Sequence, residues 1–308
     1  MLALARAEAY PLPVTTCYFT CPSWVIEGPE DRARIHAQAS RGAALFGARA
    51  VLSPLCDRFG PAETWLPAAD RVADIVAGFA HEVLWSARGG HGAVHLLDAI
   101  MARPETRAPL LLAYSDGTVL HACWRAKGWG ESWYASLGAV EQAGRAHDTL
   151  ARLARGEGWR RERAIDPGVV ALRPGVAEGP LVVGCLSVLA WLVGSAAARP
   201  LAGCVLAIED IDITPFNADY CLTQLHHAGL LDGVVGLVGG GFTNMRPGRS
   251  GMTVTDIIAI WADRLGVPGI ASLPFGHVDD GLVMPNGRAV RLEVAADGGW
   301  SFTVEPRT

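Results

Sequence analysis

The stretch Leu110-Leu111-Leu112-Ala113-Tyr114-Ser115-Asp116-Gly117-Thr118 decides the fold. It begins with an apolar run of the length of a buried strand and ends in small, polar residues that form turns. A helical pattern continues to residue 125. The stretch therefore predicts a buried strand, a sharp turn and a helix, a unit typical of a parallel sheet covered by helices on both faces.

The same alternation of strands and helices extends along the chain in both directions. It weakens between residues 127 and 179, where residues 152–163 indicate a basic, solvent-exposed segment and residues 164–174 a linker. We therefore expect two domains, at residues 1–165 and 175–308. In the N-terminal half, strands are expected at 13–20, 50–53, 82–87 and 108–114, and helices at 30–46, 68–80 and 93–101. In the C-terminal half, strands are expected at 182–183, 204–208, 233–239, 269–273, 289–294 and 301–304, and helices at 216–228 and 254–265.

The composition argues against several classes of protein. Charged residues make up 19% of the 308 residues and the formal net charge is −5, so no basic surface for nucleic acid is indicated. The seven scattered cysteines form neither a disulfide framework nor a zinc motif. Residues 180–198 carry no charge, but glycine and serine dilute their hydropathy, which favours a buried strand and helix over a membrane span. We expect a cytoplasmic protein without a membrane segment.

Ser115 lies at the carboxyl end of the predicted buried strand, where open α/β sheets place their ligands. The backbone N–H groups that follow, starting at Asp116, have no partner in the first turn of a helix and can face a developing oxyanion. Taken alone, Ser115 is better explained as an ordinary helix N-cap. A catalytic role requires a base within reach of its hydroxyl group.

Three further segments place polar residues after predicted strands. Arg88-Gly89-Gly90-His91-Gly92 can turn its N–H groups toward an anion, although such runs also form plain tight turns. Glu209 and Asp210 end a strand, where a carboxylate can orient a histidine or form a salt-bridged rim. His277 follows another strand in a loop that Pro274 stiffens. Together with Ser115, these residues make a serine hydrolase the leading hypothesis.

These blocks, in this order, resemble the LD-carboxypeptidases and the related microcin C immunity peptidases from about residue 22 to residue 288. The blocks that carry the resemblance are R-G-G-x-G at 88–92, Y-S-D-x-T at 114–118, E-D at 209–210, Q-L-x-x-A-G-L at 224–230 and F-G-H at 275–277. The resemblance implies an N-terminal α/β domain with a flavodoxin-like or glutaminase-like parallel sheet. It also implies a smaller C-terminal α/β domain with a barrel-like sheet, and a homodimer.

The resemblance also implies a mechanism without metal or cofactor. Ser115 is the expected nucleophile, His277 the general base and then acid, and Glu209 the carboxylate that orients His277. The oxyanion hole is expected from the N–H groups of Asp116 and of Gly89 or Gly90. The implied substrate is a small peptide, cut between an L-centre and a terminal D-residue, as in the release of D-Ala from murein tetrapeptide during recycling of peptidoglycan.

Several positions depart from the family pattern and leave the substrate open. His91 replaces the usual Tyr, Cys185 stands where the family's G-G-N-L block has Asn, and Gly117 replaces Ile or Val. The segment 129–138 lacks the usual H-G-P. His91, Cys185 and Arg88 are candidate substrate-binding residues, and Arg88 is equally explained as an ion-pair strut under its turn.

Three other functions remain open from the sequence. An amide of an aminoacyl nucleotide is a second substrate class, since a Trp can stack on a nucleobase, although packing is the better explanation for each Trp. An α/β-hydrolase esterase is a third hypothesis, because residues 113–117 approach G-x-S-x-G. A non-catalytic ligand-binding protein is the fourth. The tryptophans near the domain junction are Trp124, Trp129, Trp133 and Trp159.

Overall fold

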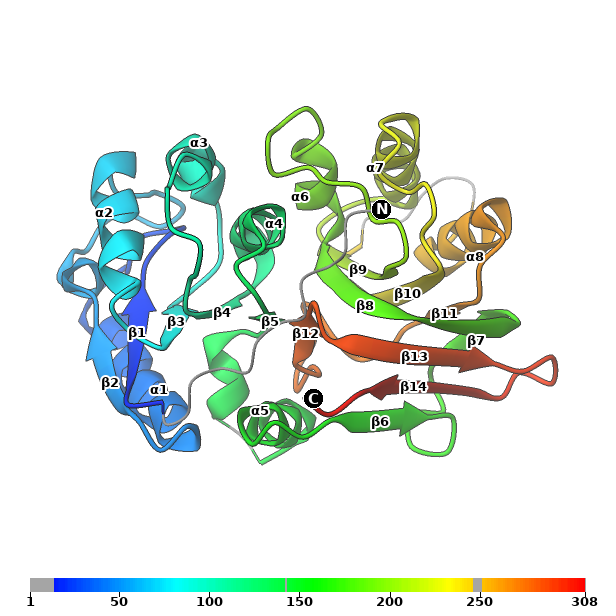
Figure 1. The fold of residues 1–308 in the computed structure, drawn as a ribbon, viewed down its shortest axis with the longest axis horizontal. Coiled ribbons are helices and arrows are strands. Elements are labelled where there is room, and N and C mark those ends of the chain that lie inside the picture. The colour runs from blue at the N-terminus through cyan, green and yellow to red at the C-terminus, as the bar shows by residue number, and fades with distance from the viewer. Residues whose placement is uncertain (1–13, 142, 246–250, 308) are drawn as a thin grey trace.

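The predicted parallel sheet forms the N-terminal half of the fold in the computed structural model, which describes residues 14–141, 143–245 and 251–307. Its strand order is β12-β5-β4-β3-β1-β2 (Figure 1). Strands β1 to β5 run parallel, and β12 pairs with β5 in the opposite direction. The order 2-1-3-4-5 of the parallel strands is that of flavodoxin-like sheets. The strands are β1 Thr16–Thr20, β2 Arg49–Leu52, β3 Val83–Ser86, β4 Leu110–Ala113, β5 Ser132–Tyr134 and β12 Met284–Asn286.

Helices cover both faces of this sheet because its buried strands point alternate side chains to opposite faces. In β4, Leu110 and Leu112 pack in the same apolar cluster as residues of α1 and α5. Leu111 and Ala113 pack in the cluster that contains residues of α2, α3 and α4. The helices are α1 Pro29–Leu45, α2 Ala68–Gly78, α3 Leu97–Met101, α4 Thr118–Lys127 and α5 Arg145–Ala154, with short 3-10 helices at η1 Pro54–Asp57, η2 Ala93–Leu96, η3 Ser115–Gly117 and η4 Leu137–Val140.

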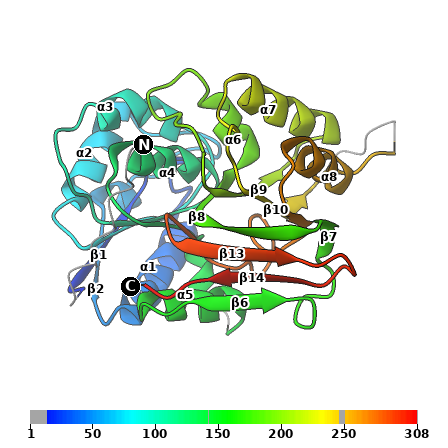
Figure 2. The same cartoon turned by 45° about the vertical axis from the view of Figure 1, so that its right-hand side comes forward.

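The second sheet has eight strands in the order β6-β14-β13-β8-β9-β10-β11-β7, and it curls into a half-barrel (Figure 2). Strands β8 to β11 are parallel, and the remaining pairings are antiparallel. Helices α6, α7 and α8 pack with strands β8 to β11 in one apolar cluster. The elements are β6 Trp159–Glu162, β7 Val170–Arg173, β8 Gly175–Cys185, α6 Leu186–Trp191, β9 Val205–Ile211, α7 Pro215–His227, β10 Gly236–Thr243, α8 Val254–Leu265, β11 Gly269–Ala271, β13 Ala289–Val294 and β14 Trp300–Val304.

The expected fold class is confirmed, and strands cross the expected domain boundary in both directions. β6 precedes residue 165 but belongs to the second sheet, whereas β12 comes from the C-terminal half and forms an edge of the first. One apolar cluster contains residues of both sheets. The two sheets therefore share a core, which fixes β4 relative to the second sheet.

Three local interpretations of the sequence can be compared with the structure. Residues 180–198 form the end of β8 and helix α6, as expected for a buried strand and helix. Within the ranges described above, no helix has both the length and the hydropathy to cross a bilayer. Residues 152–163, expected to be a basic, solvent-exposed segment, include the end of α5 and strand β6. Leu153 and Trp159 are buried there, whereas the other residues are half-buried or exposed. Residues 164–174, the expected linker, contain β7, which pairs with β11.

Candidate active site

Ser115 lies on the sharp turn between β4 and α4, in the short 3-10 helix η3. Its φ is +57°, in the left-handed region that non-glycine residues rarely adopt. The side chain of Thr118 donates a hydrogen bond to the Ser115 carbonyl at 2.7 Å. Gly117 fits the tightness of this turn, since a Cβ atom there would lie 2.6 Å from the Cβ of Ala113. This contact is a physical reason for glycine where the family usually has a larger residue.

Ser115, His277 and Glu209 form one continuous hydrogen-bonded chain. The Oγ atom of Ser115 lies 3.0 Å from Nε2 of His277, and Nδ1 of His277 lies 2.7 Å from Oε2 of Glu209. Because Nδ1 carries the proton that the carboxylate accepts, Nε2 is the acceptor for the Ser115 hydroxyl. Two sheets contribute, since Ser115 follows β4 of the first and Glu209 lies in β9 of the second. This is the arrangement that activates a serine as a nucleophile.

Glu209 is fully buried, so its charge has to be stabilised by hydrogen bonds. Its Oε2 accepts both the backbone N–H of His277, at 3.0 Å, and the imidazole Nδ1–H. Its Oε1 accepts the hydroxyl of Tyr134 at 2.5 Å. Three donors therefore hold the carboxylate in one orientation toward His277.

Gly276 allows the loop that carries His277 to approach Glu209 closely. Its φ is +94°, and a Cβ atom there would lie 2.5 Å from Oε2 of Glu209. Both the backbone conformation and the missing side chain are needed here. The sequence indicated this loop through the F-G-H block, and the structure gives a physical reason for its glycine.

We expect Gly276→Ala to reduce kcat at least about 100-fold, because displacement of His277 by a fraction of an ångström misaligns the base. The free energy of unfolding should fall by about 2 to 4 kcal/mol, from left-handed strain and overpacking. Gly266→Ala is the control, since Gly266 has φ +71° but no atom within 4 Å of an added Cβ. Steady-state kinetics and thermal unfolding of both variants would check this, and equal kinetics for the two would contradict it.

The glycine turn after β3 lies directly against the nucleophile. A Cβ atom on Gly89 would be 2.9 Å from the Cβ of Ser115, and one on Gly90, whose φ is +121°, would overlap the ring of Trp24. Within the described ranges, the N–H groups of Gly89, Gly90 and Asp116 have no hydrogen-bond acceptor. Their role as oxyanion donors stays a prediction that this close approach supports.

The side chain of Asp116 joins the two turns. Its buried carboxylate accepts the backbone N–H of Ala93, which follows the glycine turn, at 2.8 Å. Burial raises the pKa of this carboxyl group, partly offset by that N–H donor and by the nearby Ser23, His91 and Arg71. Asp116 therefore fixes the glycine turn relative to Ser115.

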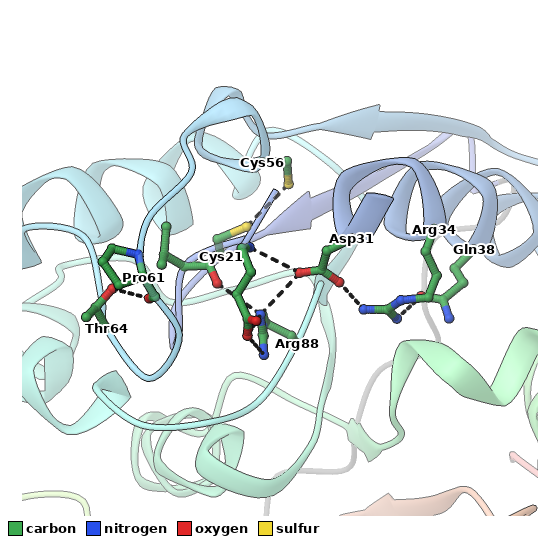
Figure 3. Close-up of polar contacts among 10 residues, drawn as sticks. Cys21, Asp31, Arg34, Gln38, Cys56, Pro61, Thr64 and Arg88 are labelled. Atoms are coloured by element: carbon green, nitrogen blue, oxygen red, sulfur yellow. Dashed lines mark hydrogen bonds and ion pairs between the residues drawn. The ribbon is translucent and has the colours of Figure 1, made fainter. Parts of the chain in front are cut away.

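Two roles were considered for Arg88, binding of a substrate and an ion-pair strut under the glycine turn. Its contacts favour the strut. Its guanidinium donates to the carbonyl oxygen of Val25 at 3.0 Å and pairs with Asp31 and Glu27, both at 3.2 Å (Figure 3). These partners hold both terminal nitrogens of the guanidinium and balance its charge with two carboxylates, as expected for an ion-pair strut. Arg88 thereby anchors the glycine turn to the segment before and at the start of α1.

His91 and Cys185 take up different positions around the turns. His91 is exposed, and its ring packs edge-on against Trp65 at a centroid distance of 5.2 Å. Cys185 is buried, and its thiol lies 3.3 Å from Asp210. Its backbone N–H donates to the Thr118 hydroxyl at 3.0 Å, so the backbone of Cys185 supports the Ser115 turn. Contact of either side chain with a substrate stays a prediction.

A cavity of about 420 Å³ opens beside the triad. Tyr114, which precedes the nucleophile, and Gly276 and Val278, which flank His277, line it. The ring of Tyr114 also packs against His277 at a centroid distance of 4.7 Å. The cavity has enough volume for the end of a small peptide. It borders the triad through these chain neighbours, and neither Ser115 nor His277 is among the residues that line it.

Sequence reasoning missed Tyr134, the residue that joins Ser115 to Glu209. Its hydroxyl oxygen accepts the backbone N–H of Ser115 at 3.0 Å and donates its proton to Glu209. Tyr134 ends the three-residue strand β5, in the segment where the strand and helix pattern is weakest. The one available signal was its place in the segment that lacks the family's H-G-P.

Comparisons with known proteins agree with this geometry. The family model described as the LD-carboxypeptidase N-terminal domain matches residues 18–135, and that of the C-terminal domain matches residues 178–292. A Streptomyces coelicolor protein named as a carboxypeptidase is 32% identical over 247 residues, which are 75% of each chain. A Bacillus subtilis protein named as a murein peptide carboxypeptidase is 30% identical over 126 residues, or 40% of each chain.

Solved structures share the fold at low sequence identity. The muramoyltetrapeptide carboxypeptidase from Oxalobacter formigenes has a TM-score of 0.75 and 19% identity, covering 94% of this chain and 100% of that one. The microcin C7 self immunity protein MccF has a TM-score of 0.74 and 16% identity, covering 98% of this chain and 99% of that one. The family models and the Streptomyces relative settle the family. The chain belongs to the LD-carboxypeptidase family and is a serine peptidase.

Proposed function

We propose that this chain is a cytoplasmic carboxypeptidase that hydrolyses an L,D-amide bond and releases D-Ala from murein tetrapeptide. The observation that carries the proposal is the hydrogen-bonded chain from Ser115 through His277 to Glu209. The relative named as a murein peptide carboxypeptidase supports the choice of substrate. Such an activity fits the recycling of peptidoglycan fragments.

In the proposed reaction, the Ser115 hydroxyl attacks the carbonyl carbon of the L-centre while His277 takes its proton. The carbonyl oxygen becomes an oxyanion that the N–H groups of Asp116 and of Gly89 or Gly90 stabilise. The C–N bond then breaks, and D-Ala leaves with the proton from His277. A water molecule, deprotonated by His277, hydrolyses the acyl-enzyme and restores the Ser115 hydroxyl. Glu209 holds the imidazole in the required tautomer and stabilises its positive charge.

The test is D-alanine release from purified murein tetrapeptide, measured near neutral and mildly basic pH. We expect release that a chelator does not reduce, because the proposed mechanism needs no metal. A tetrapeptide ending in L-Ala is the matched control and should be cut at least about tenfold more slowly. Absence of D-alanine release throughout this pH range would contradict the proposed substrate.

Amides of aminoacyl nucleotides are the second substrate class. The self immunity protein MccF, similar in fold, is described in complex with glutamyl sulfamoyl guanosine. The four tryptophans considered for stacking on a nucleobase are all buried, so their role is packing. The buried residues are Trp124, Trp129, Trp133 and Trp159. This finding favours the muropeptide over the nucleotide, and the homodimer expected from the family stays a prediction.

A further inference from the structure

The hydroxyl of Tyr134 lies between the nucleophile turn and the acid of the triad. It accepts the N–H of Ser115 at 3.0 Å and donates to Oε1 of Glu209 at 2.5 Å. Tyr134 is buried, and its ring packs against Tyr114 and His121, at centroid distances of 5.2 and 5.7 Å. A single hydroxyl group therefore connects two elements from different sheets.

The phenol of Tyr134 remains protonated and so remains a donor. Burial raises the pKa of Tyr134 well above its usual value, and the charge of Glu209 raises it further. Ionisation would place a second negative charge beside a buried carboxylate. The hydrogen bond to Glu209 is therefore a charge-assisted one, which is stronger than a bond between neutral groups.

The other titratable groups around Glu209 and His277 supply no positive charge. Burial raises the pKa of Tyr114, at the end of β4, of Cys185, at the end of β8, and of Asp210, beside Glu209 in β9. Of the two aspartates in the His277 loop, Asp279 is exposed and Asp280 pairs with Arg145. His121, on the far side of Tyr134, has its pKa lowered to about 4 by burial and is neutral. Within the described ranges, Tyr134 is thus the one side-chain donor to Glu209 besides His277.

The bond to Ser115 acts on a strained residue. A left-handed conformation at a non-glycine residue persists where its surroundings hold it in place. The Tyr134 hydroxyl satisfies the N–H of Ser115, so this N–H is not one of the oxyanion donors. The oxyanion hole then depends on Asp116 and the glycine turn.

We propose that Tyr134 is a positioning residue that couples the Ser115 turn to Glu209 and thereby sets the pH range in which His277 accepts the serine proton. The proposal rests on the proposed function, in which Ser115 is the nucleophile. It goes beyond the triad because it assigns a role to a fourth side chain, which is hydrogen-bonded to Glu209 and to the backbone of Ser115 and takes no part in proton transfer itself.

The test is Tyr134→Phe, which removes one oxygen atom and keeps the ring. The rate is measured with a fluorophosphonate, which forms a bond from phosphorus to the Ser115 oxygen with loss of fluoride and needs no peptide substrate. Without the Tyr134 donor, the Glu209–His277 pair should hold a proton more tightly. As the pH is lowered, the variant should therefore lose its reactivity at a higher pH than the unsubstituted protein does. We expect a rate about 10 to 100 times lower and an acidic limb shifted upward by roughly one pH unit.

Two controls separate positioning from packing. Tyr18→Phe removes a comparable buried hydroxyl, which donates to Asp74 at 2.6 Å in the first sheet, and should leave rate and pH profile unchanged. Site-specific 3-fluorotyrosine at position 134 keeps the hydroxyl and makes it a stronger donor, so it should move the acidic limb to lower pH. It also keeps the proposal testable if Tyr134→Phe does not fold.

An unchanged acidic limb in Tyr134→Phe, with or without a lower rate, would overturn the proposal. So would an upward or absent shift with 3-fluorotyrosine. The proposed function fails in a distinguishable way, because absence of D-alanine release from a protein that still reacts with the fluorophosphonate at Ser115 would reject the substrate and leave the role of Tyr134 standing. Absence of any reaction at Ser115 in the unsubstituted protein would overturn both proposals.

Discussion

Ser115→Ala is expected to lower kcat for D-alanine release by about 10⁶-fold, since removal of the nucleophile of a triad leaves only binding and oxyanion stabilisation. The fold should persist. Alanine has the same Cβ as serine, so the left-handed conformation at φ +57° becomes no more strained. The hydrogen bonds of the turn to Tyr134 and Thr118 use backbone atoms of residue 115 and remain.

The measurement is single-turnover and steady-state release of D-alanine, together with the melting temperature. Ser40→Ala is the matched control, because Ser40 is an exposed serine whose hydroxyl donates to the His36 carbonyl in α1. It should show unchanged kinetics. A Ser115→Ala protein that is folded and retains more than about one hundredth of the activity would contradict the assignment of the nucleophile.

Glu209→Gln should give the second largest effect, a fall in kcat of about 10⁴-fold with a smaller change in KM. The amide keeps the shape of the side chain but carries no charge to stabilise the imidazolium. Its NH₂ group also cannot accept from His277 or Tyr134, which both donate to the carboxylate in the native protein. The variant therefore disturbs both the tautomer of His277 and the Ser115 turn.

Asp210→Asn is the matched control, since Asp210 is the adjacent buried carboxylate of β9. Its oxygens accept from the N–H groups of Ser187 and Ile211 and from the thiol of Cys185, but not from His277. We expect kcat to stay within about tenfold of the native value, although stability falls because one N–H loses its acceptor. Similar losses of kcat in the two variants would indicate that buried charge in β9, and not the contact with His277, supports activity.

The sequence predicts elements well where local chemistry defines both ends. Helix α8 begins at a capping box formed by Thr253 and Asp256 and ends at Gly266, whose φ is +71°. Its bounds agree with the expected range 254–265, as those of β13 agree with 289–294. In such segments periodicity and capping residues carry the information.

The segment between residues 127 and 179 was poorly predicted because long-range pairing defines its strands. β5 has three residues and lies between β4 and β12, and β12 is about 150 residues further along the chain. β6 and β7 form the two edges of the second sheet, against β14 and β11. Helix α5 has only four buried residues, and they lie among charged ones. The apolar periodicity of this short helix was therefore too weak to be recognised in the sequence.

The same distinction applies to the site. The residues of the triad lie in or after strands and belong to recognisable blocks, so their order along the chain and the resemblance to the family brought them together. Tyr134 has no such signal, because its role arises only where β4, β5 and β9 come together. For Arg88, the sequence suggested a contact that the structure does not favour. Its place beside a glycine turn suggested binding of a substrate, but its partners Val25, Glu27 and Asp31 are distant in sequence, and only the fold brings them to its side chain.

The most direct test of the central claim is to locate the group that inactivates the enzyme. The protein is treated with a fluorophosphonate until D-alanine release stops, then digested, and the phosphonyl group is located by mass spectrometry. We predict one group per chain, on the oxygen of Ser115, and none in Ser115→Ala. A phosphonyl group on another residue, with Ser115 unmodified in the inactivated protein, would contradict the claim.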